Sequence, residues 1–208
     1  MKIIKPVVSI ESDLNGEYVL ALLEKIGRIC YKSEEKIASD SAKVFIKSLI
    51  DRGHESVIEH YNISVRIVCD RGVTHEIVRH RLASYSQEST RYCNYSKEKF
   101  GSELSFIEPN FWQEDKEKMS IWKDTMCYIE KNYLALMNLG ATAQEARAIL
   151  PNSLKTEIVM TMNLREWRHF FKLRTSQAAH PQMREIAGMI LSEFTKKVPV
   201  IFDDICNN

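Results

Sequence analysis

The sequence predicts an α+β fold, namely a helix-rich single domain over residues 1–208 with a small mixed or antiparallel sheet and no Rossmann unit. A chain of 208 residues with 44% hydrophobic composition can bury one core. Apolar residues recur mostly at helical spacing, and the few strand-like segments do not alternate regularly with helices. The seven glycines are widely separated, so the glycine-rich motifs that bind dinucleotides and nucleoside triphosphates are absent.

The N-terminal half is expected to contain, in order, a strand at 2–10, helices at 17–31 and 40–52, a strand at 61–70 and a helix at 73–81. Pro6 indicates that the first strand lies at a sheet edge. Asp40 or Ser41 could cap the second helix, which should stop at Gly53. Apolar residues alternate with mostly polar ones at 61–70, which is typical of a half-buried strand.

The C-terminal half is expected to contain a short strand at 104–108, a long helix at 114–139, a short helix at 142–151 and final helices at 164–174 and 181–197. Thr142 and Glu145 have the spacing of a capping box, and Pro181 suits a first helical turn. Residues 153–162 are compatible with a strand, but their apolar residues do not decide the matter.

A polar stretch from Arg79 to Tyr92 is the most distinctive feature of the sequence. It contains three arginines, one histidine and four serine or threonine residues. Arginine binds phosphate or carboxylate through a bidentate fork, and hydroxyl groups add donors without charge. We interpret the stretch, which should begin at a helix end and continue as a loop, as a site for a polyanionic ligand. An ordinary surface loop is the alternative.

A second concentration of basic residues lies on the predicted helix 164–174. Helical spacing would place four of them on one face: Arg165, Arg168, His169 and Lys172. A solvated basic face would explain this pattern. However, the aromatic residues Trp167, Phe170 and Phe171 give the helix a strongly buried side, and Arg174 lies where the chain turns. This helix is therefore a second candidate for ligand binding.

The segment from His54 to His60 combines two histidines with two glutamates. Its spacing does not fit a helical zinc motif, so we expect polar ligands or a structural pair and no bound metal. The five cysteines are widely spread without C-x-x-C spacing, which predicts a reducing cytoplasm and neither structural zinc nor a redox pair. Ser89 lacks the G-x-S-x-G context of a nucleophile, so we interpret it as a ligand-binding hydroxyl.

The pattern Arg79-His80-Arg81-x-x-Ser84-x-x-x-x-Ser89-x-Arg91 resembles the signature of the flavin-dependent thymidylate synthases. The resemblance continues in the expected order at 53–56, 59–60, 145–147, 150–151, 163–165, 173–174 and 180–182. It implies an α+β homotetramer with active sites between subunits, in which FAD is bound without a glycine motif. The implied reaction is the reductive methylation of dUMP to dTMP, with 5,10-methylenetetrahydrofolate as one-carbon donor and NADPH-reduced FAD as hydride source.

The resemblance also assigns binding residues. FAD contacts are expected at His54, Ser56, Glu59, Arg79, His80, Arg81, Leu82, Asn163, Arg165 and His169. Contacts with dUMP are expected at Glu76, Arg79, Gln87, Glu88, Ser89, Thr90, Arg91, Arg147 and Arg174. In this assignment Arg91 and Arg147 suit the phosphate. Arg174 would be the catalytic residue, because a cation at the pyrimidine edge stabilises negative charge on the ring carbonyl and N3 as C5 becomes nucleophilic.

Three positions depart from the family pattern. Glu76 stands where other members have glutamine, and a glutamate cannot donate to a carbonyl unless it is protonated. His169 stands where asparagine is common, and Cys30 where serine occurs. The departures bear on individual contacts and not on the resemblance itself.

The alternative function is a single-stranded nucleic-acid binding module that uses the loop 79–95, where arginines lie beside Tyr85, Tyr92 and Tyr95. The net charge of +1 means that such binding would need this local patch. A second rival is a metal-dependent nucleotide hydrolase built on His54 to His60. No apolar run approaches transmembrane length and the start lacks a signal-peptide plan, so we expect no membrane partner. The expected location is the cytoplasm, as the cysteines indicate, and with small-molecule substrates as the main interpretation we expect no nucleic-acid partner.

Overall fold

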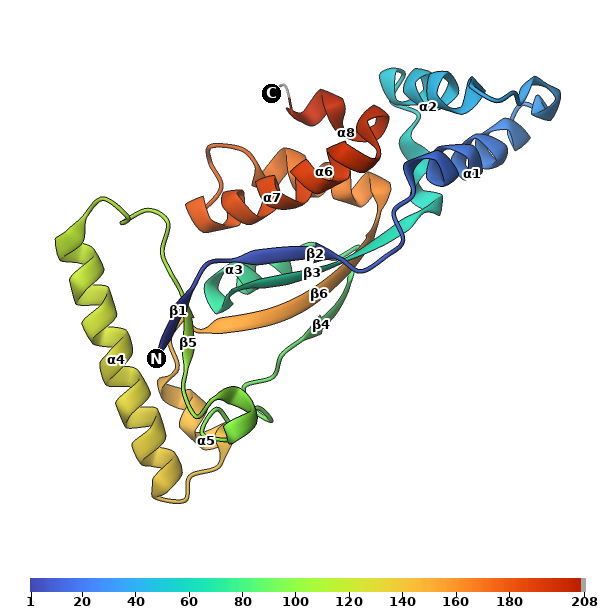
Figure 1. The fold of residues 1–208 in the computed structure, drawn as a ribbon. Helices are drawn as coiled ribbons and strands as arrows, with labels where there is room; N and C mark the ends of the chain where they lie inside the picture. The colour runs from blue at the N-terminus through green and yellow to red at the C-terminus, as the bar shows by residue number, and fades with distance from the viewer. Residues whose placement is uncertain (207–208) are drawn as a thin grey trace. The chain divides into compact units, whose positions relative to one another are not determined.

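The computed structural model describes residues 1–206, in which helices and short strands are intermixed along the chain (Figure 1). The strands are β1 Lys2–Ile4, β2 Val7–Ile10, β3 Asn62–Asp70, β4 Ser84–Gln87, β5 Ser105–Ile107 and β6 Lys155–Asn163. The α-helices are α1 Gly16–Ile29, α2 Ser41–Asp51, α3 Arg71–Ile77, α4 Lys116–Asn138, α5 Ala143–Ala146, α6 Leu164–Arg174, α7 Pro181–Lys197 and α8 Pro199–Cys206. Short 3-10 helices are η1 Glu34–Lys36, η2 Glu55–His60, η3 Glu98–Phe100 and η4 Arg147–Ile149. This composition confirms the predicted helix-rich α+β class.

The strands form two small sheets. One has four strands in the order β2-β3-β6-β4, and the other pairs β1 with β5 in parallel. β3 buries alternate residues, namely Ile63, Val65, Ile67 and Cys69, as the sequence predicts for a half-buried strand. β6 shows the same alternation, so the segment that the sequence leaves undecided is a strand.

Several predicted boundaries are wrong, each for a local reason. Residues 2–10 form two strands instead of one, because Pro6, which lacks an N–H, lies in the break between them. α3 ends at Ile77, so the Arg-His-Arg triplet follows the helix instead of closing it. Residues 84–87 of the expected loop form the edge strand β4, and α8 is a helix that the sequence does not predict.

Most other expectations about the helices are confirmed, but the side-chain cap expected from Asp40 does not form. α6 and α7 have the predicted bounds, and α4 differs from its predicted bounds by only one or two residues. Both hydrogen bonds of the predicted capping box form at the start of α5. Asp40 occupies the N-cap position of α2, but its side chain makes no capping hydrogen bond. Among the described residues, no helix is both long enough and apolar enough to cross a membrane.

The chain divides by its packing into two compact units. The first unit comprises Met1–Val7, Ile67–Arg79 and Tyr85–Val159, and the second comprises Val8–Arg66, His80–Ser84 and the chain from Met160 onward. β3 and β6 belong partly to each unit, so the division does not fall at a linker. A single domain over residues 1–208 therefore stays a prediction.

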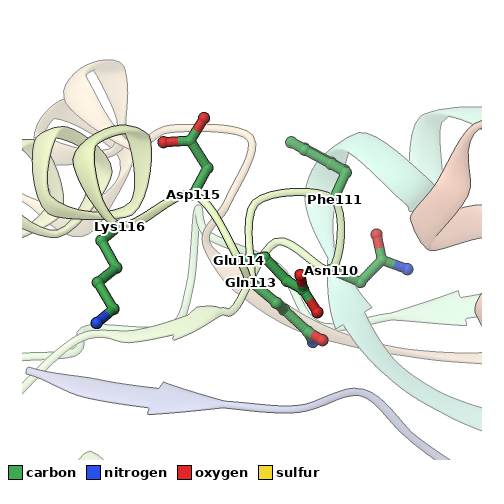
Figure 2. Close-up of a pocket in the computed structure, with 6 residues that line it drawn as sticks. All are labelled: Asn110, Phe111, Gln113, Glu114, Asp115 and Lys116. Carbon is green, nitrogen blue, oxygen red and sulfur yellow. The ribbon is translucent and has the colours of Figure 1, made fainter.

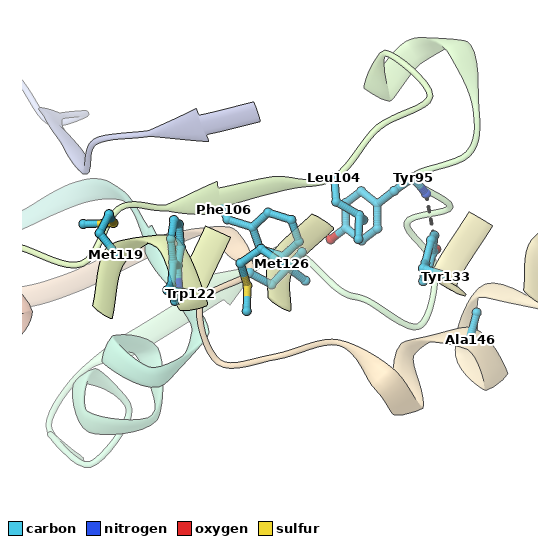
Figure 3. Packing of buried hydrophobic residues seen from close by; sticks show 9 residues of the cluster. Tyr95, Leu104, Phe106, Met119, Trp122, Met126, Tyr133 and Ala146 are labelled. Atoms are coloured by element: carbon cyan, nitrogen blue, oxygen red, sulfur yellow. Dashed lines mark hydrogen bonds between the residues drawn. The ribbon is translucent and has the colours of Figure 1, made fainter. Parts of the chain in front are cut away.

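The core of the first unit is built on α4 (Figure 3). The helix contributes Met119, Trp122, Met126 and Tyr133, which cluster with Tyr95, Leu104, Phe106, Ala146 and Leu154. The indole of Trp122 donates to the Ser153 hydroxyl at 3.1 Å, and the Tyr133 hydroxyl accepts from the backbone N–H of Tyr95 at 3.4 Å. Burial of Tyr95 anchors the segment that follows the polar stretch.

The core of the second unit is aromatic and centres on α6. Trp167 is fully buried, stacks on Phe171 at 5.6 Å between ring centroids, and meets Phe170 and Phe194 edge-on. Its indole N–H donates to the carbonyl of Ile63 in β3 at 3.1 Å. α6 also packs against η2, α7 and α8, so its side chains are held from several directions.

Candidate functional site

The predicted site residues fall into two groups, one in each unit. The first unit carries Glu76, Arg79, Gln87, Glu88, Ser89, Thr90, Arg91 and Arg147, all of which are assigned to dUMP, and Arg79 is assigned to FAD as well. The second unit carries His54, Ser56, Glu59, His80, Arg81, Leu82, Asn163, Arg165 and His169, which are assigned to FAD, together with Arg174.

In the first unit, hydrogen bonds fix Gln87 and Glu88 at the end of β4. The Gln87 amide donates to the hydroxyls of Thr74 at 2.9 Å and Thr156 at 3.3 Å. The backbone N–H of Glu88 donates to the carbonyl of Glu157 at 2.8 Å. The polar edge strand is thus attached to α3 and β6 by both side-chain and main-chain bonds, which gives these two residues fixed directions.

The Glu88 carboxylate is held between two donors, and neither contact is predicted from the sequence. It accepts from the Tyr95 hydroxyl and from the Lys155 ammonium, each at 2.8 Å. Burial, with Glu88 adding to it, raises the pKa of Tyr95 above its usual value, so the phenol remains a donor. Lys155 offsets the charge of Glu88, and this reduces the repulsion that an anionic ligand would meet there.

The turn from Ser89 to Arg91 presents arginine near a second polar segment. The Ser89 carbonyl accepts from the N–H groups of Tyr92 and Cys93, and its hydroxyl accepts from the N–H of Arg91 at 3.3 Å. Arg91 is exposed and donates to the amide oxygen of Gln144 in α5 at 3.2 Å. Arg147, also exposed, begins η4 directly after α5. This unit therefore offers solvent-facing guanidiniums on an ordered turn.

In the second unit, η2 and α6 are joined by ion pairs. Arg165 lies 2.6 Å from Glu59, and both side chains are solvent-exposed. Arg168 contacts Glu55 at 3.1 Å and Asp204 of α8 through two hydrogen bonds at 2.7 and 2.6 Å. It also donates to the carbonyl of Ile201. These bonds hold the segment that carries His54, Ser56 and Glu59 against α6.

One residue does not lie on the predicted basic face of α6. That face was expected to contain Arg165, Arg168, His169 and Lys172, and Arg168 is the exception. Arg168 is only 1% exposed, whereas the other three side chains are exposed. The spacing of the buried stripe gives the reason, because Arg168 lies four residues after Leu164 and three before Phe171, both fully buried. Arg168 therefore belongs to the packed side of α6, where its carboxylate partners compensate the buried charge.

Arg174 and His80 bring the two basic segments of the sequence into direct contact. The Arg174 Nε donates to the His80 Nε2 at 3.0 Å, although the residues are 94 positions apart. The imidazole is 8% exposed and lies edge-on to Phe170, with 5.0 Å between ring centroids. Burial, with the nearby charge of Arg174 adding to it, lowers the pKa of His80 to about 4, so the ring is neutral near pH 7.

Asn163 caps α6 with the side chain that was expected to contact FAD. Its amide oxygen accepts from the N–H of Glu166 at 2.9 Å. We expect Asn163→Ala to lower the free energy of unfolding by about 1 kcal/mol, because the helix loses its cap. Urea denaturation followed by circular dichroism measures this, and Asn163→Asp, which keeps the acceptor, is the matched control. Equal stability of the alanine variant and the wild type would contradict the capping role.

The geometry disfavours both rival functions. Of the three tyrosines proposed for stacking, Tyr95 is 6% exposed and Tyr85 donates its hydroxyl to the carbonyl of Ile77 at 2.9 Å. Only Tyr92, at 75% exposure, presents an open ring. A metal-dependent hydrolase would need carboxylates available between His54 and His60, but Glu55 and Glu59 both form ion pairs with arginines.

A hollow of about 700 Å³ in the first unit lies in the loop before α4 (Figure 2). It is lined by Asn110, Phe111, Gln113, Glu114, Asp115 and Lys116. None of these residues was predicted for the site. Asp115 accepts from the Lys118 N–H as the cap of α4, and it also pairs with the Lys118 ammonium at 2.8 Å. Asp115 thus has a structural role in the turn into α4, where the hollow lies.

The structure is that of an α+β protein that carries exposed arginines on ordered segments and has no glycine-rich loop. The sequence profile of the family described as thymidylate synthase complementing protein matches residues 18–200. The chain is 37% identical over 178 residues to a flavin-dependent thymidylate synthase of Pyrococcus furiosus, covering 85% of this chain and 72% of that protein. A protein of the same name from Geobacter sulfurreducens is 33% identical over 184 residues, covering 85% and 78%.

The fold agrees with these similarities. A crystal structure of a UMP/dUMP methylase, PolB from Streptomyces cacaoi bound with 5-Br dUMP, superimposes with a TM-score of 0.82 at 19% identity, covering 98% of this chain and 96% of that one. The chain therefore belongs to the flavin-dependent thymidylate synthase family.

Proposed function

We propose that this chain is an FAD-dependent thymidylate synthase that methylates dUMP reductively to dTMP. The one-carbon donor is 5,10-methylenetetrahydrofolate and NADPH is the reductant. The observation that carries the proposal is the family match over residues 18–200, which contains every residue assigned to either ligand. The contact between Arg174 and His80 supports it, because two distant parts of the family pattern meet in the folded chain.

The dUMP site is proposed to use Glu76, Arg79, Gln87, Glu88, Ser89, Thr90, Arg91, Arg147 and Arg174. Arg91 and Arg147 are exposed guanidiniums, which suits a phosphate dianion. The Gln87 amide is already oriented by Thr74 and Thr156, so it can read a polar group of the nucleotide without reorganising. Arg174 would stabilise the negative charge that develops on the uracil ring.

The FAD site is proposed to use His54, Ser56, Glu59, Arg79, His80, Arg81, Leu82, Asn163, Arg165 and His169. Arg81, Arg165 and His169 are exposed donors on ordered segments, which supports a site for a dinucleotide. Such groups can bind a diphosphate without a glycine-rich loop. When bound and reduced by NADPH, FAD supplies the hydride of the reaction.

The quaternary structure and location are also part of the proposal. We infer a homotetramer with active sites at subunit interfaces, in the cytoplasm. Exposure of Arg79, Arg91 and Arg147 supports the subunit arrangement, because cationic side chains at the surface of one chain could complete a site on another. The molar mass in solution by light scattering tests this part separately from the chemistry.

The purified protein should be yellow and release FAD on denaturation. It should form dTMP from dUMP only when NADPH and 5,10-methylenetetrahydrofolate are both present, measured by chromatography of the nucleotides. A chelator should leave the rate unchanged, and binding to single-stranded DNA should be negligible at moderate salt. A colourless preparation that also fails to take up added FAD would falsify the proposal, and tight, salt-sensitive polynucleotide binding would favour the alternative.

A further inference from the structure

His80 has an environment that suits a fixed hydrogen-bond acceptor. It lies between α3 and β4, within the Arg-His-Arg triplet, and it is the one member of that triplet that is buried. The edge-on contact with the fully buried Phe170 restrains the ring plane, and the ring of His169 lies 6.3 Å away at 68°. A side chain confined in this way presents its Nε2 in one direction.

Arg174 depends on this acceptor because of its place in the chain. It is the last residue of α6, and the next segment, up to Pro181, is a turn. An arginine side chain at a helix end has many rotamers, and fixing it in one of them costs conformational entropy. A hydrogen bond donated by Nε restrains the guanidinium plane, and the two terminal nitrogens then have a defined orientation.

We propose that His80 is a positioning residue that sets the plane of the Arg174 guanidinium, so that its terminal nitrogens meet the carbonyl and N3 edge of the uracil ring. This inference rests on the proposed function. It assigns His80 a role through Arg174, in addition to the flavin contact expected from the family. His80 need not touch the nucleotide to act in this way.

The protonation state of His80 agrees with this role. To accept from Arg174, the Nε2 must carry no proton, so the ring proton resides on Nδ1. The low pKa of His80 keeps the imidazole in that neutral form at physiological pH. An imidazolium would offer no acceptor and would repel the guanidinium 3.0 Å away.

Two substitutions of His80 distinguish the effect of its acceptor nitrogen from that of its aromatic ring. His80→Phe keeps an aromatic ring against Phe170 but removes the acceptor, whereas His80→Gln keeps an acceptor at a similar reach without the ring. We expect kcat for dTMP formation, measured per bound FAD, to fall by about 100-fold in His80→Phe, since small misplacements of a catalytic group cost about this much. His80→Gln should recover most of that loss.

The double variant His80→Phe/Arg174→Ala tests whether the effect passes through Arg174. We expect it to be no slower than Arg174→Ala alone, because a positioning residue has nothing to position once the arginine is gone. Additive losses would overturn the inference, as would wild-type kcat in His80→Phe. The inference would also be overturned if His80→Phe and His80→Gln lost FAD equally while kcat per bound FAD stayed unchanged, because His80 would then act only through FAD binding.

A measurement on the wild type requires neither activity nor a variant. In 15N NMR spectra at pH 7, His80 should show the neutral ring with its proton on Nδ1, and protonation on Nε2 would overturn the inference. Failure of the wild type to form dTMP with every substrate present would instead overturn the proposed function. The two failures are therefore distinguishable.

Discussion

Replacing Arg174 with alanine should reduce dTMP formation by about 1000-fold or more while the protein remains folded. Loss of one donor to a developing oxyanion typically costs about 100- to 1000-fold in kcat, and Arg174 would contribute a full positive charge as well as donors. Because a guanidinium remains protonated at any relevant pH, this charge is available throughout the reaction. Steady-state kcat with saturating dUMP measures the effect.

Two neighbouring changes provide controls for this experiment. Arg174→Lys keeps the charge but loses the planar fork and the Nε donor to His80, so its kcat should lie between those of the wild type and Arg174→Ala. Lys172→Ala, on the same helix, removes an exposed cation that is not assigned to either ligand, and it should leave kcat unchanged. Wild-type turnover by Arg174→Ala would show that the uracil ring is activated by some other group.

Periodicity identifies strands in the sequence only where the buried residues are unambiguous. In β3, four aliphatic or thiol residues alternate and the strand is predicted correctly. In β6 the same face includes Thr156 beside Ile158, Met160 and Met162, and methionine suits helices as well as strands. β4 has no apolar pattern, because it is a polar edge strand held by Thr74, Thr156 and Glu157. Its existence depends on tertiary contacts that a local pattern does not contain.

The candidate site, like strand β4, depends on tertiary contacts that a local sequence pattern does not contain. Residue type and order are enough to assign arginines, histidines and hydroxyls to anionic ligands. They do not reveal the residues that hold these groups, such as Lys155 and Tyr95 around Glu88, which come from distant segments. One missed feature did have a local signal. The buried stripe Leu164, Trp167, Arg168 and Phe171 has regular helical spacing, so an arginine within it must be buried with partners.

Arg168→Met should be among the most destabilising changes in the second unit. It would remove the cation that joins η2, α6 and α8 through Glu55, Asp204 and the carbonyl of Ile201. Removing one partner of a buried pair typically costs about 3–5 kcal/mol. Because Asp204 and Glu55 are partly exposed and can be rehydrated, we expect about 3 kcal/mol, the lower end of that range. Urea denaturation of wild type and variant measures the difference.

The acid dependence of stability should reveal the pairing of Arg168 with Asp204. Hydrogen bonding to Arg168 lowers the pKa of Asp204 in the folded protein. The resulting stabilisation is present above the unfolded pKa, near 4, and is lost as the pH falls through the folded value. Arg168→Met should therefore lose less stability than the wild type on acidification below about pH 4. Parallel pH profiles of the two proteins would contradict this assignment.

Arg165→Met is the matched control for both measurements. It removes an arginine from the same helix that also faces the η2 segment, but its side chain is 48% exposed and its ion pair with Glu59 is solvated. Exposed ion pairs contribute little to folding, so this variant should show only a small fraction of the Arg168→Met loss. Equal losses in the two variants would mean that burial does not distinguish the two arginines, and the role assigned to Arg168 would then be wrong.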